Sequence, residues 1–339
     1  MSITEEGTSR FVTVKGVRIH YNEAGTGPVL VLIHGGGPGA SGWSNYNRNI
    51  EVLARSFRVI VPDLPGFGKS DIKPKGSAMP AWYATKMGEF LDELGIDKAH
   101  FVGNSLGGMV TLRLALDRPE KVDRMVLMGP GGSIPMFSQF PTEAIKTLLF
   151  FYDGPGPSIE RLRGFVKDFV YDPSQITEEL LEGRMKTALQ PHIVETPPMR
   201  PDPKALMEPV WNDPRLASLK HETMIIWGRE DRVMPIDMAF PLLKQIPRAR
   251  LFVLPQCGHW AQWEHADEFN RVFSLRPASA SRQHNETPPR TLPHQRHGHN
   301  AGHHPSLPAP AEHRRTRHRR PPQLITHAAH STHQPLPTT

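Results

Sequence analysis

The chain has 339 residues and a formal net charge of +6. The whole basic excess lies in residues 276–339, with nine arginines and two glutamates, so charge does not argue for nucleic-acid binding by the remainder. One cysteine, Cys257, excludes an intrachain disulfide, and no apolar stretch approaches the roughly 18 residues of a membrane helix. The first residues lack the basic and apolar regions of a signal peptide, so we expect a cytoplasmic protein without a membrane partner.

Apolar runs alternate with helical patterns along residues 1–275, as in a sheet whose parallel strands are buried on both faces. The expected strands are 11–14, 17–21, 29–34, 58–62, 99–102, 124–128, 223–227 and 250–254. The expected helices are 45–55, 82–94, 106–117, 237–245 and 260–272. This order predicts an α/β fold with a mostly parallel, eight-stranded sheet flanked by helices.

The alternation stops between two parts of this core, residues 1–132 and 214–275. Residues 133–213 instead show helical patterns broken by proline and glycine, which predicts a helical cap inserted into the core.

A different composition begins at residue 276. Residues 276–339 contain eleven histidines, eleven prolines and no aromatic residue, which predicts a disordered tail. The histidines lack the spacing of metal ligands, so we predict no metal site and no cofactor. Metal binding, contact of the basic run 314–320 with nucleic acid or a membrane, and a shifted reading frame are the alternatives for this tail.

A Gly-x-Ser-x-Gly run, Gly103 to Gly107, lies between an expected strand and an expected helix. This pattern is typical of a nucleophile elbow, a sharp turn that presents the serine hydroxyl at the end of the strand. The sequence therefore predicts Ser105 as a nucleophile. The backbone N–H of Leu106, at the start of the helix, is the first expected oxyanion donor.

An acid and a base follow in the order that this architecture uses. Asp231 and His259 each come just after an expected strand, where open α/β sheets place their sites. His259 would accept the serine proton, and Asp231 would orient the imidazole. Glu230 is the rival acid, but its neighbouring position points it elsewhere.

A glycine-rich loop follows the expected strand 29–34. Its glycines, Gly35, Gly36 and Gly37, allow backbone N–H groups to approach a substrate closely, as in an oxyanion loop. A phosphate loop is the alternative, but no Gly-Lys-Ser/Thr follows within this loop.

With these motifs, the chain resembles the α/β-hydrolase family and, within it, the meta-cleavage product hydrolases, over roughly residues 8–273. The matching segments are His34-Gly35-Gly36-Gly37-Pro38-Gly39-Ala40, Gly103-Asn104-Ser105-Leu106-Gly107-Gly108, Met128-Gly129-Pro130-Gly131-Gly132, Trp227-Gly228-Arg229-Glu230-Asp231-Arg232 and Cys257-Gly258-His259-Trp260-Ala261-Gln262-Trp263-Glu264-His265.

The resemblance implies a triad of Ser105, Asp231 and His259, with oxyanion donors at Gly36 and Leu106. It also implies that Arg184 binds the carboxylate and enol oxygen of a dienoate, for which a planar guanidinium is suited. The other implied substrate contacts are Gly35, Gly37, Asn45, Asn104, Phe169 and Trp260.

The implied reaction is hydrolysis of the C5–C6 bond of a 2-hydroxy-6-oxohexa-2,4-dienoate by a homo-oligomeric enzyme. The aromatic residues of the expected cap favour an aryl group on carbon 6 over an alkyl or steroid-derived group. A carboxylesterase, which would not need Arg184, and a non-catalytic small-molecule receptor on the same fold remain the alternatives.

Overall fold

The structure is a computed structural model that describes residues 3–72, 74, 77, 79–201 and 209–274. By its internal contacts the chain divides into two units, 1–281 and 282–339, and every described residue belongs to the first unit. The predicted disordered tail, residues 276–339, lies outside the described residues.

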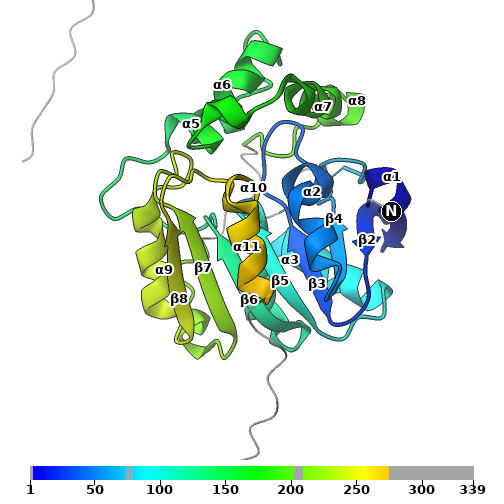
Figure 1. Ribbon diagram of the computed structural model, residues 1–339, viewed down its shortest axis with the longest axis vertical. Coiled ribbons are helices and arrows are strands. Elements are labelled where there is room, and N and C mark those ends of the chain that lie inside the picture. The colour runs from blue at the N-terminus through cyan, green and yellow to red at the C-terminus, as the bar shows by residue number, and fades with distance from the viewer. Residues whose placement is uncertain (1–2, 73, 75–76, 78, 202–208, 275–339) are drawn as a thin grey trace, which may run out of the picture. The chain divides into compact units, whose positions relative to one another are not determined.

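An eight-stranded sheet forms the centre of the described unit, with the strand order β1-β2-β4-β3-β5-β6-β7-β8 (Figure 1). Its strands are β1 Ser9–Val14, β2 Val17–Ala24, β3 Val29–Ile33, β4 Arg58–Pro62, β5 Ala99–Asn104, β6 Val122–Met128, β7 Glu222–Gly228 and β8 Ala249–Leu254. β2 runs antiparallel to both β1 and β4, and the remaining pairs are parallel. The predicted α/β fold with a mostly parallel, eight-stranded sheet is therefore confirmed.

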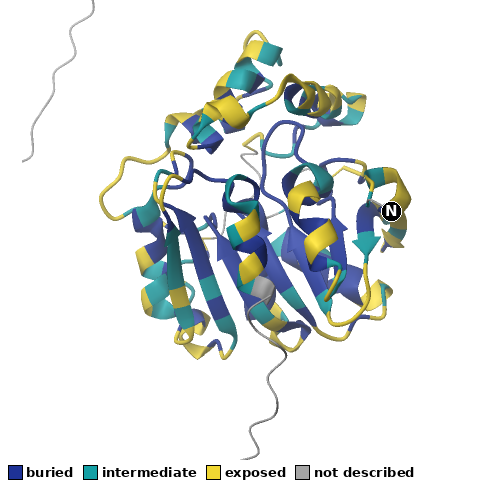
Figure 2. Ribbon diagram, in the orientation of Figure 1, coloured by how far each residue is buried: buried dark blue, intermediate teal, exposed yellow. Residues whose placement is uncertain are grey.

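Two hydrophobic cores lie on opposite faces of this sheet, because successive side chains of a strand point to opposite faces. In β3, Leu30 and Leu32 pack in the core that includes residues of α2 (Gly42–Leu53) and α11 (Ala266–Ser274). Val31 and Ile33 pack in the core that includes residues of α3 (Ala81–Glu93) and α4 (Leu106–Asp117). Figure 2 shows the central strands as a continuous buried layer between exposed helix faces. Burial on both faces explains why these strands are nearly continuous apolar runs.

Helices cover both faces and the strand ends. The helices outside the segment between β6 and β7 are α1 Glu5–Thr8, α2 Gly42–Leu53, α3 Ala81–Glu93, α4 Leu106–Asp117, α9 Ala239–Gln245, α10 Ala261–Glu264 and α11 Ala266–Ser274. Short 3-10 turns span Pro119–Lys121, Pro173–Gln175, Pro214–Ser218 and Ile236–Met238. Helix α2 begins three residues before its predicted start, because Ser41 and Ser44 form a reciprocal capping box.

The single helix predicted over residues 260–272 was wrong. The structure divides it into α10 and α11 at His265, whose φ and ψ of −117° and 47° are not helical. The Glu264 side chain reaches back to backbone N–H groups of the preceding loop, and the chain starts a new helix after it. Hydrophobic periodicity does not reveal a break of one residue.

Four helices between β6 and β7, which we call the cap helices, lie above the strand ends in Figure 1. They are α5 Glu143–Leu149, α6 Ile159–Phe169, α7 Glu178–Ala188 and α8 Pro191–Glu195. Ser or Thr side chains cap the first three, which accounts for their short, interrupted pattern in the sequence. None of the helices in the described part of the chain is both long enough and apolar enough to cross a membrane.

Candidate active site

Ser105 occupies a strained turn between β5 and α4. Its φ of 53° and ψ of −112° lie outside the regions that a serine normally adopts. Gly103 and Gly107 allow this turn, because a Cβ on either residue would collide with a backbone carbonyl group. The Ser105 N–H donates to the Met128 carbonyl at 2.8 Å, so the turn is tied to the end of β6.

The two expected oxyanion donors are the backbone N–H groups of Leu106 and Gly36. Leu106 is the first residue of α4, so its N–H has no intrahelical acceptor. The loop after β3 also lies close to Ser105, since a Cβ on Gly35 would lie 3.2 Å from the Ser105 Cβ. The next residue, Gly36, faces Met199, whose Sδ would lie 2.9 Å from a Cβ there.

His259 and Asp231 form a buried pair. His259 Nδ1 lies 2.7 Å from Asp231 Oδ2, and both side chains are almost fully buried. The other carboxylate oxygen of Asp231 accepts from the backbone N–H groups of Val233 and Met234, which hold the carboxylate in place. His259 Nε2 is buried and has no hydrogen-bond partner among the described residues.

The rival acid points elsewhere. Glu230 pairs with Arg229 at 2.7 Å and accepts from the Cys257 N–H at 3.1 Å. The structure therefore brings Asp231, and not Glu230, to His259.

Arg184 extends from α7 into the interior between the cap helices and the glycine-rich loop. Its side chain is 2% exposed, Nη2 donates to the Pro38 carbonyl at 2.8 Å, and the guanidinium carbon lies 5.0 Å from the Trp260 ring centroid. Burial lowers the pKa of Arg184 to about 10, which leaves it a cation at neutral pH. Its Nε and Nη1 groups are buried without a partner among the described residues.

The other predicted substrate contacts lie at different places around this centre. Asn104 donates to the backbone carbonyls of Met128 and His259, and its Oδ1 is buried without a described partner. Phe169 packs edge-on against His259 and Trp260 at 5.0 and 5.1 Å.

Asn45 and Gly37 have different surroundings. The side-chain amide nitrogen of Asn45 donates to the carbonyl of Ser41, the residue that caps the start of α2. Gly37 has a φ of +133°, and a Cβ there would lie 3.5 Å from Arg184 Nη2, so this glycine belongs to the surroundings of Arg184.

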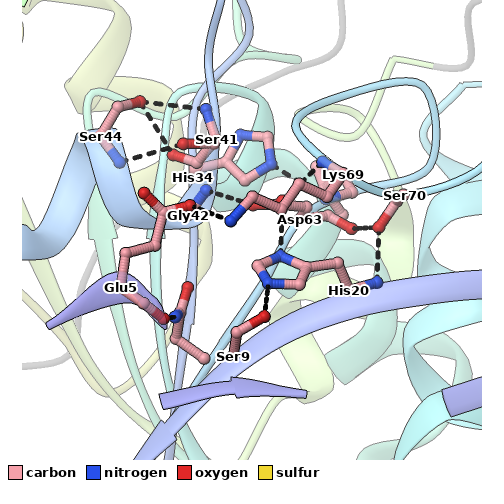
Figure 3. A network of polar contacts seen from close by, with 12 residues as sticks. Glu5, Ser9, His20, His34, Ser41, Gly42, Ser44, Asp63, Lys69 and Ser70 are labelled. Carbon is pink, nitrogen blue, oxygen red and sulfur yellow. Dashed lines mark hydrogen bonds and ion pairs between the residues drawn. The ribbon is translucent and has the colours of Figure 1, made fainter. Parts of the chain in front are cut away.

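Figure 3 shows a polar network around Asp63, together with His34, the residue that precedes the glycine-rich loop. Asp63 accepts from the N–H of Gly42, at the start of α2, at 2.7 Å, and from His20 Nδ1 at 2.8 Å. His34 Nε2 accepts from the Leu64 N–H at 2.9 Å, so the hydrogen is on Nδ1, which donates to the Gly35 carbonyl. Burial lowers the pKa of His34, which favours this neutral form.

Sequence reasoning missed the role of Glu264. Its carboxylate accepts from the N–H groups of Gly258 and Trp260, on either side of His259. A glutamate five residues after a candidate base, on the first helical turn that follows it, was the available signal.

These groups provide a hydroxyl, a buried imidazole, two candidate oxyanion donors and a buried cation. Such a set is suited to hydrolysis through a tetrahedral intermediate of an anionic substrate. Over the described residues, no group of three or more His, Cys, Asp or Glu side chains is placed to hold a metal ion.

Comparison with known proteins identifies the fold and the close relatives. The model of the alpha/beta hydrolase fold family matches residues 28–266. The 2-hydroxy-6-oxo-6-phenylhexa-2,4-dienoate hydrolase of Burkholderia cepacia is 44% identical over 278 residues, which cover 80% of this chain and 96% of the relative. The 2-hydroxy-6-oxononadienedioate/2-hydroxy-6-oxononatrienedioate hydrolase of Comamonas testosteroni is 43% identical with the same coverage.

A solved structure agrees with these relatives. The meta-cleavage product hydrolase of Pseudomonas fluorescens IP01 has a TM-score of 0.69 and 35% identity, covering 78% of this chain and 95% of the other. Fold and site thus define an α/β hydrolase. Within that fold family, the chain belongs to the meta-cleavage product hydrolases, as the sequence resemblance implied.

Proposed function

We propose that this protein hydrolyses the C5–C6 bond of a 2-hydroxy-6-oxohexa-2,4-dienoate. The products are 2-hydroxypentadienoate and a carboxylic acid derived from carbon 6. The names of the relatives from Burkholderia cepacia and Comamonas testosteroni support this substrate class.

The buried Arg184 cation is the observation that carries this proposal. An ester substrate does not require a buried guanidinium, whereas the carboxylate and enol oxygen of a dienoate match its fork of N–H donors. Two of its nitrogens, Nε and Nη1, have no protein partner in the described part of the chain. Leaving such donors buried is costly, so a ligand that accepts from them gains affinity.

In the proposed reaction the dienol first ketonises, and a proton is delivered to carbon 5. His259 accepts the proton of the C2 hydroxyl and gives it to carbon 5, and Asp231 stabilises the imidazolium between these two transfers. Either Ser105 or a water molecule then adds to the carbon-6 ketone. The N–H groups of Gly36 and Leu106 stabilise the oxyanion of the tetrahedral species.

Collapse of the tetrahedral species breaks the C5–C6 bond. Its electron pair forms the C4–C5 double bond, the conjugated enone becomes the enolate of carbon 2, and the C2 oxygen takes up the proton held by His259 to give 2-hydroxypentadienoate. Attack by Ser105 gives an acyl-enzyme that water hydrolyses, whereas attack by water passes through a gem-diol. Rapid chemical quench followed by peptide mass measurement separates the two routes, because only the first leaves an acyl group on Ser105.

We propose residues 133–213 as the cap and an aryl group as the substituent on carbon 6. Phe169 and Phe165 pack together at 4.5 Å beside His259, which supports an aromatic environment near the reacting carbon. Tyr152, Leu148 and Ile193 line an apolar cleft against the glycine-rich loop. Phenyl, alkyl and carboxylate-bearing ring-fission products, compared by kcat/KM, test this preference.

The activity is tested by mixing the purified chain with the yellow phenyl-substituted dienoate and following the loss of absorbance. We expect rapid bleaching, with slower hydrolysis of a p-nitrophenyl ester. Hydrolysis of the ester alone would identify a carboxylesterase, and binding without turnover would identify a receptor.

The Arg184→Lys variant is the matched control for substrate class. It keeps the charge but loses the planar fork, so we expect a raised KM for the dienoate and an unchanged KM for the ester. Equal effects on both substrates would remove the support that Arg184 gives to the proposal.

We also propose that the enzyme is a homo-oligomer of the cytoplasm. Light scattering of the purified chain measures its mass, and fractionation of the producing cells locates it.

A further inference from the structure

The loop that carries His259 is bonded to the end of a cap helix. The His259 N–H donates to the carbonyl of Phe169, the last residue of α6, at 2.6 Å. Gly258 permits this approach, because a Cβ there would lie 2.5 Å from the same carbonyl oxygen and 2.9 Å from the Tyr171 nitrogen. The end of α6 and the loop that carries His259 therefore contact each other through their backbones.

Glu264 completes this junction from the core side. Its Oε1 accepts from the N–H groups of Gly258 and Trp260 at 3.0 and 3.2 Å, and Oε2 accepts from the Tyr171 N–H at 2.6 Å. One carboxylate thus holds both neighbours of His259 together with the chain that leaves α6.

The environment of Glu264 is unusual for a glutamate. Burial raises the pKa of its carboxyl group, while the N–H donors of Tyr171, Gly258 and Trp260 lower it. No Lys or Arg is paired with Glu264 among the described ion pairs; its partners there are three backbone N–H donors and, at 4.0 Å, the Cys257 thiol. Such an arrangement orients a loop, because backbone donors in fixed positions define where the carboxylate must lie.

We propose that Glu264 is a positioning residue that holds the His259 loop to the end of α6. The imidazole is then oriented only while the end of α6 is packed against this loop. Phe169 shares in this coupling, because its carbonyl accepts from His259 and its ring packs on the same imidazole. The consequence for turnover rests on the proposed hydrolase function, whereas the coupling itself does not.

The test compares Glu264→Gln with Glu268→Gln in the full chain. Both substitutions remove one negative charge from neighbouring helices, but Glu268 is 42% exposed and lies 3.7 Å from His265. Glu264→Gln keeps the size of the side chain and turns one acceptor into a donor that faces N–H groups.

The first measurement is amide hydrogen exchange without substrate. In Glu264→Gln we expect exchange at Tyr171, Gly258 and Trp260 to be at least tenfold faster, with β5 and β6 unchanged. In Glu268→Gln we expect no change at these three amides. Equal exchange in the two variants, or faster exchange throughout the sheet, would overturn the proposal, since the second result indicates general destabilisation.

The second measurement is turnover of the dienoate and of a p-nitrophenyl ester. In Glu264→Gln we expect kcat to fall at least tenfold for both, because His259 serves both reactions, with KM changed less than threefold. A kcat within twofold of that of Glu268→Gln would contradict the proposal. If the native chain does not cleave the dienoate, the proposed function fails, while the exchange and ester results still decide the role of Glu264.

A third variant can be measured if Glu264→Gln does not fold. Glu264→Asp keeps the charge but withdraws the carboxylate by one methylene. We expect faster exchange at the same three amides, and native-like exchange in this variant would overturn the proposal.

Discussion

Two groups of Ser, His and Asp side chains can be compared among the described residues, one at the candidate active site and one away from it. Ser9, His20 and Asp63 are linked by hydrogen bonds of 2.9 and 2.8 Å, a complete chain of contacts (Figure 3). In the group around Ser105, His259 Nδ1 is bonded to Asp231, but His259 Nε2 has no partner within the described residues.

The backbone around the two serines separates them. Ser9 starts the edge strand β1 with ordinary extended φ and ψ of −63° and 131°, whereas Ser105 has a φ of 53° in a turn before α4. Leu106 follows Ser105 with an N–H in the first turn of its helix. From this comparison we propose Ser105, and not Ser9, as the nucleophile, because only Ser105 combines a strained turn with an adjoining N–H donor.

The two aspartates are also used differently. Asp63 accepts from the backbone N–H groups of Gly42 and Lys69 besides His20, and so joins loops that follow β3 and β4. Burial alone would raise the pKa of Asp63, but the hydrogen bonds from His20 and from the Lys69 N–H, with the nearby charge of His20, lower it below its usual value. We interpret this group as a structural support for the glycine-rich loop.

The largest expected effect compares the two serines in catalysis. Ser105→Ala should lower kcat/KM for the dienoate by about 10³-fold or more, because loss of a catalytic-triad nucleophile has effects of this size or larger. Ser9→Ala should leave kcat/KM within twofold of the native value. Steady-state bleaching of the dienoate measures both, and a large loss in Ser9→Ala would contradict the assignment of roles.

The next effect concerns stability at Asp63. Asp63→Asn should lower the free energy of unfolding by about 3–5 kcal/mol, because it breaks a buried pair and leaves donors poorly matched. The control is Asp123→Asn, which removes the exposed partner of His100 and should cost about 1 kcal/mol or less. Urea denaturation measures the free energy of unfolding of both variants. Equal losses would show that the buried Asp63–His20 pair stabilises the fold no more than the exposed Asp123–His100 pair.

We expect a smaller effect on the free energy of unfolding at acidic pH. Because the pKa of Asp63 is lowered in the folded state, its contribution to stability is present above its ordinary pKa and is lost as the pH falls below it. Between about pH 5 and pH 3, the free energy of unfolding should fall more steeply in the native chain than in Asp63→Asn. Urea titrations across this range test the difference, and parallel curves would refute it.

The smallest effect is the stability change in Ser9→Ala. Removing this hydroxyl breaks one partly buried hydrogen bond to His20, which should cost about 0.5–1.5 kcal/mol. Thermal unfolding of the same variant used for kinetics provides the measurement. A loss of unfolding free energy as large as that of Asp63→Asn would instead show that Ser9 contributes as much to the stability of this group as Asp63 does.

The local pattern of the chain determined the order of strands and helices, the elbow at Ser105 and the candidate base at His259. These features depend on neighbours in the sequence: apolar runs that form buried strands, and glycines that a sharp turn requires. The break between α10 and α11 could not be predicted in this way, because it accompanies contacts of Glu264 with backbone N–H groups.

Only the tertiary structure decided which side chains meet. It brought Asp231 rather than Glu230 to His259, buried Arg184 against the loop at Pro38, and bonded Ser9 to His20 away from the candidate site. Arg184 and Pro38 lie 146 residues apart in the chain, so no local pattern contains their contact. Secondary structure follows from local sequence preferences, whereas the surroundings and partners of a charged side chain follow from the packing of distant segments.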